Sequence, residues 1–227
     1  MAHEYPLHFR AKHLFLELDA RLWLVDTGSP MSFGAPGEVA IADRRFQLTP
    51  AFHGLNATSL SASVGVDCAG LLGADVLNEF DFRLDTGAGR ATVATGQLEL
   101  EGTPVAMEQI MGLPVVTVRI SDASRRMIFD TGAQLSYLDS AAELDRLPSA
   151  GQAQDFYPGF GEFATETWQV PMTVAGAEYT IRCGVLPALL STALSLFGTD
   201  GILGNVLLEG RTVVYAPRRG TMTVVGG

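Results

Sequence analysis

Two aspartates begin the same short motif, and each directly follows an apolar segment. Asp26 begins Asp-Thr-Gly-Ser after Leu22–Val25, and Asp130 begins Asp-Thr-Gly-Ala after Met127–Phe129. Two carboxyl groups held about 3 Å apart cannot both ionise easily, so such a pair shares one proton. The ionised carboxylate can take a proton from a water molecule while the protonated one polarises a carbonyl group. The two motifs therefore predict amide hydrolysis at one shared site.

The residues that follow each aspartate suit this pairing. Gly28 and Gly132 allow a tight turn and place no Cβ where the opposite turn approaches, and their N–H groups can donate to the carboxylates. Thr27 and Thr131 offer hydroxyls that can bond across the junction, where a buried polar group needs a partner. Further along, each motif is followed by two apolar residues and a glycine, which we expect to pack behind the turns: Leu71-Leu72-Gly73 and Ile202-Leu203-Gly204.

The two motifs belong to an internal repeat. They lie 104 residues apart (130 − 26), and Ser32-Phe33 and Ser136-Tyr137 follow them at equal offsets. Alternating and β-branched residues predict two strands before each aspartate, and a short helical piece and a hairpin after each glycine. We therefore expect an all-β chain of two similar lobes, residues 1–104 and 105–227, with a few short helices. The predicted strands are 14–18, 22–25, 82–85 and 90–94 in the first lobe, and 115–120, 127–129, 212–215 and 221–225 in the second.

The second lobe is longer between its aspartate and its glycine, by 74 residues against 47. Residues Ser140 to Glu143 are typical of a capping box, and Pro148 would end the helix that follows. Residues 187–197 are apolar nearly all round and are followed by Gly198, which predicts a buried core helix.

A third Asp-Thr-Gly-Ala begins at Asp85, but its surroundings differ. Arg83 precedes it, and in the register of the repeat it falls on the turn after Tyr215. Asp and Gly both favour tight turns. We expect a hairpin turn here and no catalytic role.

Composition excludes several classes of function. The chain has 227 residues, of which 47% are hydrophobic and 18% charged, as in a folded globular protein of one or two domains. Its net charge of −10 argues against nucleic-acid binding, which needs a cationic surface. Two cysteines, Cys68 and Cys183, and four scattered histidines form neither a disulfide framework nor a metal-ligand spacing, so two buried thiols and no metal are expected.

Membrane and export signals are not found in the sequence. No run of about 18 apolar residues predicts a membrane span. The first residues lack the basic-then-apolar build of a signal peptide. The cytoplasm is the expected compartment, although a chain whose leader had been removed would look the same.

The motifs make the chain resemble the pepsin–retropepsin superfamily of aspartic peptidases. The resemblance covers both halves, and it implies a bilobal, closed-barrel fold produced by tandem duplication. It further implies a catalytic pair of Asp26 and Asp130, no metal or cofactor, and a β-hairpin flap over a peptide bound in extended conformation. It rests on Val25-Asp26-Thr27-Gly28-Ser29 and Phe129-Asp130-Thr131-Gly132-Ala133, with their apolar-apolar-Gly partners.

The resemblance also implies roles for the neighbouring residues. Thr27 and Thr131 would form a grip across the lobes. Ser29 matches the serine that can bond its aspartate in pepsins. Ala133 matches the alanine of retropepsins, which is associated with a less acidic working pH and favours activity near neutrality.

The flap is the part in which the chain departs from the family. No tyrosine lies between Asp26 and Gly70, so the flap tyrosine of pepsins has no counterpart there, and we expect a short polar flap within residues 46–60. A hairpin of the second lobe is the better candidate for the lid. The alternative is that this hairpin simply packs on its own lobe. Its candidate substrate-binding residues are Tyr157, Phe160 and Trp168.

The sequence thus predicts an aspartic endopeptidase that is complete as a monomer, because both half-sites occur in one chain. A catalytically silent peptide-binding or regulatory module on the same scaffold is the alternative. Retention of both aspartates, both threonines and both glycines argues against it, since a binding module needs no paired acids. Neither nucleic acid nor a membrane is expected as a partner.

Overall fold

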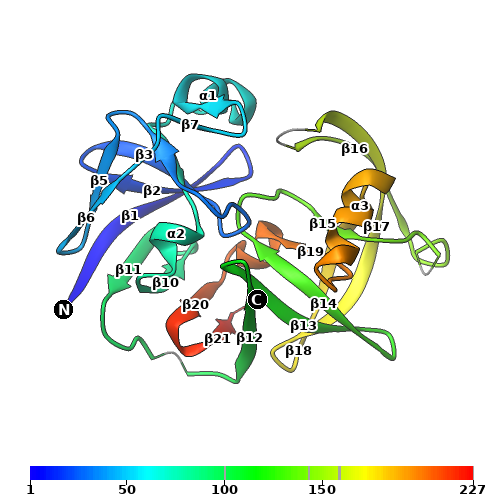
Figure 1. The fold of residues 1–227 in the computed structure, drawn as a ribbon. Helices are drawn as coiled ribbons and strands as arrows, with labels where there is room; N and C mark the ends of the chain where they lie inside the picture. Colours follow the sequence, from blue (N-terminus) through cyan, green and yellow to red (C-terminus); the bar gives the residue numbers. More distant parts are fainter. Residues whose placement is uncertain (100, 143, 158–159, 227) are drawn as a thin grey trace.

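The computed structural model describes residues 1–99, 101–142, 144–157 and 160–226, and the chain is mostly β (Figure 1). The strand pairings join most strands in one large mixed sheet, with two small hairpins outside it. No closed barrel is defined among the described residues. We call residues 1–104 the first half and residues 105–227 the second half.

The first half begins with three consecutive antiparallel strands and ends with a hairpin. The third strand, β3, pairs in parallel with β9, and β4 pairs with β9 in the antiparallel sense. The strands are β1 (Ala2–Arg10), β2 (His13–Leu18), β3 (Arg21–Val25), β4 (Phe33–Gly34), β5 (Glu38–Ile41), β6 (Arg44–Gln47), β7 (Ala51–Phe52), β8 (Leu55–Asn56), β9 (Gly70–Leu72), β10 (Asp81–Asp85) and β11 (Arg90–Ala94). The helices are α1 (Ala57–Val64) and α2 (Ala74–Leu77).

The second half repeats this order and adds a longer insertion. Strand β14 pairs in parallel with β19, and β15 pairs with β19 in the antiparallel sense, as β3, β9 and β4 do. The strands are β12 (Pro104–Ile110), β13 (Leu113–Ile120), β14 (Ala123–Asp130), β15 (Ser136–Leu138), β16 (Ser149–Tyr157), β17 (Gly161–Val174), β18 (Ala177–Val185), β19 (Gly201–Gly204), β20 (Thr212–Ala216) and β21 (Thr221–Val225). The helices are α3 (Ala188–Leu196) and the short η1 (Asn205–Leu208) and η2 (Pro217–Arg219).

Six antiparallel strands join the two halves. They lie in the order β1, β11, β10, β20, β21, β12, with three strands from each half. Phe82 of β10 faces Tyr215 of β20, and both side chains are fully buried. The largest core cluster likewise takes residues from both halves. Burial of each such side chain contributes about 1.5–3 kcal/mol, so the two halves are stabilised together.

A buried ionic cluster lies at the same junction. The carboxyl group of Asp81, which is fully buried, accepts hydrogen bonds from Arg218 at 3.0 Å and Arg219 at 2.9 Å. The backbone N–H of Leu98 donates to it as well, at 3.2 Å. Asp81 belongs to β10 and both arginines to η2, so the cluster ties the first half to the second.

Most predicted strands are confirmed, each within two residues at its ends except for β14, which begins four residues earlier than expected. The third motif is confirmed as a hairpin turn between β10 and β11. There the backbone N–H of Ala88 donates to Asp85 Oδ1 at 2.8 Å. The Thr86 hydroxyl donates to the carbonyl oxygens of Leu208 and Arg211, which fastens this turn to the second half.

Two helix predictions are corrected. Residues 140–142 and 144–147 form turns and bends in place of the expected helix, and Glu143 lies outside the described residues. Helix α3 is present, but it is not a buried core helix: Leu189 is 70% exposed and Leu196 83%, while Leu194 is buried. An apolar composition all round a helix does not specify which face packs on the protein, and α3 packs through one face only.

Helix α1 is a further element that the sequence reasoning missed. It occupies part of the segment expected to form the first flap. Its N-terminus is fixed by a capping box, in which Ser59 N–H donates to Asn56 Oδ1 at 3.0 Å and Asn56 N–H donates to Ser59 Oγ at 2.9 Å. A serine at the third helical position is a weaker signal than the usual Glu or Gln.

Both cysteines are buried and free, as predicted. Within the described residues, no helix combines the length and the apolar character that crossing a membrane would require.

Candidate active site

Each aspartate stands at the end of a strand that a parallel neighbour holds in place. Strand β3 leads into Asp26, whose backbone N–H donates to Leu72 O of β9 at 3.0 Å. Asp130 ends β14 and lies opposite Gly204 of β19. The two apolar-apolar-Gly segments therefore pack beside the strands that carry the aspartates, as predicted.

The serines of the repeat close each turn from behind. Ser32 Oγ accepts from Gly73 N–H at 2.7 Å, and Ser136 Oγ accepts from Gly204 N–H at 3.0 Å. Both hydroxyls are buried, and they lie 104 residues apart, as the aspartates do. The same local hydrogen bonds thus fix both turns.

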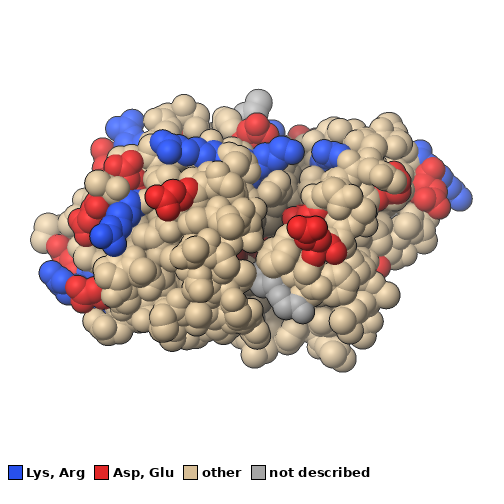
Figure 2. Space-filling view, turned by 90° about the horizontal axis from the view of Figure 1, so that it is seen from above, with Lys and Arg blue, Asp and Glu red and all other residues tan. Residues whose placement is uncertain are grey.

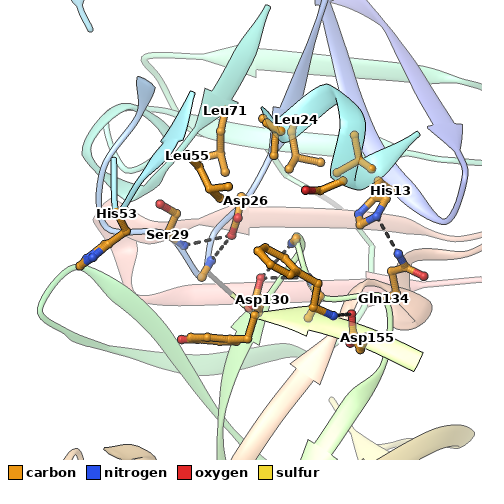
Figure 3. Close-up of a pocket in the computed structure, with 18 of the residues that line it drawn as sticks. His13, Leu24, Asp26, Ser29, His53, Leu55, Leu71, Asp130, Gln134 and Asp155 are labelled. Carbon is orange, nitrogen blue, oxygen red and sulfur yellow. Dashed lines mark hydrogen bonds between the residues drawn. The ribbon is translucent and has the colours of Figure 1, made fainter. Parts of the chain in front are cut away.

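The backbone of each turn donates to its own carboxylate (Figure 3). Gly28 and Ser29 N–H groups donate to Asp26 Oδ1, both at 3.0 Å. The corresponding N–H groups of Gly132 and Ala133 donate to Asp130 Oδ1 at 2.8 and 3.1 Å. One oxygen of each carboxyl group is therefore fixed by the turn, and Oδ2 is left for other partners.

The Ser29 side chain corrects one expectation. Its hydroxyl donates to Met31 O at 2.9 Å and not to Asp26. The turn already brings two backbone N–H groups to Asp26, and the hydroxyl finds its partner further along the chain. Ser29 and Ala133 thus give their aspartates the same kind of bond, from the backbone.

The two turns approach closely enough to require glycine. A Cβ on Gly28 would overlap the carboxyl group of Asp130, and a Cβ on Gly132 would lie 2.5 Å from Asp26 Cγ. The two carboxyl groups lie close enough for each to influence the pKa of the other. Each glycine therefore makes room for the aspartate of the opposite half.

Reciprocal threonine bonds lock the turns together. Thr27 N–H donates to Thr131 Oγ1 and Thr131 N–H donates to Thr27 Oγ1, both at 3.0 Å. Thr27 Oγ1 donates to Phe129 O at 2.5 Å, and Thr131 Oγ1 donates to Val25 O at 2.7 Å. Both threonines are buried, so these bonds form without competition from solvent.

The environment favours a shared proton on the pair. Burial is the main cause that raises the pKa of Asp26 well above its ordinary value, and the nearby Asp130 carboxylate raises it further. Burial also raises the pKa of Asp130, while the donating N–H groups and the bond from Asp26 oppose that shift. The raised values belong to the coupled pair, which holds one proton at a pH where isolated aspartates have lost theirs.

A cleft of about 440 Å³ opens above the two carboxyl groups. Figure 3 shows Leu24, Leu55 and Leu71 on the side of Asp26, and Gln134 and Asp155 on the side of Asp130. No lysine or arginine is among the described residues that line it. In Figure 2, Lys and Arg gather along one edge and at the ends of the face in view, and other residues cover most of the rest.

A histidine and a glutamine bridge the two halves at the wall of the cleft. His13 Nε2 and Gln134 Nε2 are 2.7 Å apart, and His13 Nδ1 has no partner among the described residues. Burial lowers the pKa of His13, which keeps the imidazole neutral. Sequence reasoning missed both residues, because neither is part of a motif. Among the described residues, no group of three or more His, Cys, Asp or Glu is arranged to hold a metal ion.

Two hairpins of unequal length contribute residues to the lining of the cleft, β7–β8 from the first half and β16–β17 from the second. Figure 1 shows β7 and β16 on different halves of the molecule. The shorter one lies within residues 46–60, as expected of the first flap, but Phe52 and Leu55 give it an apolar inner surface. The longer one brings Tyr157 to the cleft wall. Burial raises the pKa of Tyr157, and the carboxylates of Asp130 and Asp26 add to that rise.

The other two lid candidates lie elsewhere. Phe160 is 38% exposed and packs edge-on against Phe163, with 5.9 Å between ring centres. Trp168 packs against the main core and is not among the residues that line the cleft. Of the three, the structure places Tyr157 beside the aspartates.

No protein-family model matches this chain, and no curated protein matches it. The family resemblance therefore rests on the motifs, and any functional conclusion rests on the geometry of the site.

Proposed function

We propose that the chain is an aspartic endopeptidase whose catalytic pair is Asp26 and Asp130. The observation that carries the proposal is the meeting of two Asp-Thr-Gly turns, joined by reciprocal threonine bonds, with two mutually interacting carboxyl groups in the lining of one cleft. A structural turn needs neither a glycine against the opposite carboxyl group nor a shared proton. The pair of acids has the arrangement that general acid–base hydrolysis uses.

The proposed reaction uses one water molecule and the shared proton. The ionised carboxylate takes a proton from the water, whose oxygen attacks the carbonyl carbon of the peptide. The protonated carboxyl group gives its proton to the carbonyl oxygen, and a tetrahedral diol forms. The carboxyl group that took the proton from the water then gives it to the leaving nitrogen as the carbon–nitrogen bond breaks. One hydroxyl of the diol gives its proton to the other carboxylate, so the products are a carboxylic acid and an amine and the pair is again singly protonated.

The fold that we propose with it is bilobal, of the pepsin/retropepsin type, with each half a lobe of a tandem duplication. The matched order of strands and the matched pairings around β9 and β19 support it. Closed barrels within the lobes, and a catalytically complete monomer, are parts of this proposal. The substrate is an extended peptide lying between the halves, where hairpin edges can pair with its backbone. Tyr157 and the β16–β17 hairpin would cover it.

Substitution of either aspartate tests the proposal. Asp26→Asn and Asp130→Asn should each lower the rate of peptide hydrolysis by at least about 100-fold, because proton transfer is lost while the shape is kept. The assay is digestion of a peptide mixture by the purified protein between about pH 3 and pH 8, with products identified by mass spectrometry.

The third motif offers a matched control. Asp85→Asn changes the same residue in the same tripeptide, outside the cleft, and should leave the rate unchanged. Wild-type rates in either Asp26→Asn or Asp130→Asn would refute the catalytic assignment. Binding of peptides without any cut product would instead support the alternative, a silent peptide-binding or regulatory module.

A further inference from the structure

The internal repeat places two aromatic residues at equivalent points of the cleft. Phe33 and Tyr137 lie 104 residues apart (137 − 33), each seven residues after the aspartate of its Asp-Thr-Gly turn, and both line the cleft. Both side chains are buried. The two side chains differ by one hydroxyl group. The two halves therefore offer an apolar and a polar version of the same pocket, which can be compared within one chain.

The first-half pocket is apolar. Phe33 belongs to a separate hydrophobic cluster, and apart from Asp26 the polar residues that line the cleft from the first half are His13, Ser29, His53 and Ser63. The residues of the cluster that also line the cleft are Leu24, Phe33, Phe52, Leu55, Leu60, Val64 and Leu71. This side of the cleft suits an apolar side chain.

The second-half pocket holds a carboxylate. The Tyr137 hydroxyl donates to Asp155 Oδ2, and the backbone N–H of Phe156 donates to Asp155 Oδ1 at 2.8 Å. Burial and the Asp155 carboxylate both raise the pKa of Tyr137, which therefore stays a donor. A carboxylate has about four acceptor sites, so these two donors fix Asp155 and leave acceptor capacity free.

Nothing among the described lining residues balances this charge. None of the described residues that line the cleft is a lysine or an arginine, and burial lowers the pKa of the neighbouring His13, which favours its neutral form. Asp155 is close enough to Asp130 and to His13 to shift the pKa of both upward. Arg182 is near enough to oppose the rise in the Tyr137 pKa, but its guanidinium bonds to Thr167 and to the carbonyl oxygens of Ala150 and Gln152, and it does not line the cleft. A partly buried carboxylate beside a second acid is stabilised by a cation, and a ligand can bring one to Asp155 from within the cleft.

We propose that Asp155 is a specificity-determining residue, which selects a lysine or arginine side chain of the peptide on the second-half side of the cleft. An apolar side chain of the same peptide lies against Phe33 on the other side. The aliphatic stem of the basic residue packs on Leu186 and Ile202, and its charged end reaches Asp155. The inference rests on the proposed function, because it names the substrate class of that same cleft.

The competing explanation is structural. The bond between Tyr137 and Asp155 joins β15 to β16, and it could serve only to hold the long hairpin in place. Asp155→Asn separates the two roles, because the amide oxygen can still accept from Tyr137 while the charge is lost. Tyr137→Phe is the matched control. It recreates the first-half residue and removes the hydroxyl while the charge stays.

The experiment compares peptides that differ at one position flanking the scissile bond, with lysine, norleucine or glutamate there and leucine on the other side. Wild-type kcat/KM should be about 10- to 100-fold higher for lysine than for norleucine, the range of one charge-assisted hydrogen bond. Asp155→Asn should bring that ratio to about one and leave the norleucine rate near wild type. Tyr137→Phe should retain a preference for lysine.

Equal wild-type rates for lysine and norleucine at every position tested would overturn the proposal. So would an Asp155→Asn variant that loses both rates in proportion, since that is the result of a structural role. If no peptide is cut, the proposed catalysis fails separately, and fluorescence anisotropy with the same peptides decides on Asp155. Tighter binding of the lysine peptide that Asp155→Asn abolishes supports the assignment, and equal binding overturns it.

Discussion

The reciprocal threonine bonds make a prediction that does not depend on catalysis. Thr131→Val removes one hydroxyl and nearly keeps the shape of the side chain. That hydroxyl accepts from Thr27 N–H at 3.0 Å and donates to Val25 O at 2.7 Å. Thr131 is fully buried and Thr27 is 2% exposed, so water cannot replace the lost bonds without opening the junction.

The expected cost follows from the two groups left without partners. A buried donor or acceptor that loses its partner costs about 1–3 kcal/mol. Two such groups give about 2–6 kcal/mol, against a total stability of about 5–15 kcal/mol for a typical domain. Thr27→Val should cost a similar amount, because its hydroxyl makes the mirror-image pair of bonds with Thr131 N–H and Phe129 O.

Urea denaturation followed by tryptophan fluorescence measures the effect. Trp23 is buried in the first-half core and reports its unfolding. With a slope of about 3 kcal/mol per molar urea, the midpoint should fall by about 1–2 M. Thr131→Ser keeps the hydroxyl and is the control. An unchanged midpoint for Thr131→Val, or an equal fall for Thr131→Ser, would refute the reasoning.

Two further predictions concern acids at the junction between the halves. Asp81→Ala should lower the free energy of unfolding by about 3 kcal/mol, because Arg218 and Arg219 lose a buried partner but keep some access to water. Glu99→Ala is the control: it removes an exposed partner of Arg219 and should change the free energy of unfolding by less than about 0.5 kcal/mol. Equal effects in a urea titration would contradict this. Burial raises the folded-state pKa of the Asp26–Asp130 pair, so its contribution to stability is full below the ordinary aspartate pKa and falls as the pH rises through the raised value. Asp130→Asn should therefore gain stability relative to wild type as the pH rises above the ordinary aspartate pKa of about 4. The proposed turnover of the wild type should decline where that gain levels off, and a stability difference that is constant with pH would contradict the shift.

The sequence predicted the parts of the fold that local pattern determines. Alternating apolar residues before Asp26 and Asp130 specify strands, and Gly after Thr specifies the turn. The same reasoning separated Asp85 from the other two aspartates, since Arg83 shows that its strand has one exposed face. These features are local in the chain, and the repeat doubled each signal.

The sequence could not predict features that depend on contacts between segments far apart in the chain. The residues of α3 are apolar on every side, yet Leu196 faces solvent, because only the neighbouring strands decide which face is covered. Asp155 lies in a strand whose alternation of polar and apolar residues is ordinary, and the sequence marks its partner Tyr137 only as an aromatic residue that recurs in the repeat. His13 meets Gln134 from 121 residues away. The spacing of these residues in the sequence does not predict their contacts, which form only when distant segments pack together.

The two halves match at the Asp-Thr-Gly turns, where we propose that a proton is shared. They differ at the hairpins beside the cleft, where we propose that a substrate is selected. The threonine bonds, the backbone bonds to the carboxyl groups and the bonds from Gly73 and Gly204 to the serines behind the turns recur in both halves. The 27 additional residues between aspartate and glycine in the second half (74 − 47) accompany the long β16–β17 hairpin, which carries Asp155 and Tyr157 to the cleft. A pair of equivalent acids needs equal surroundings to share one proton, whereas a peptide has a direction and different side chains at each position. A single-chain peptidase therefore requires matching turns around its two acids and different side chains on the two sides of its cleft. Tyr137→Phe changes a side chain of the cleft and leaves the turns as they are.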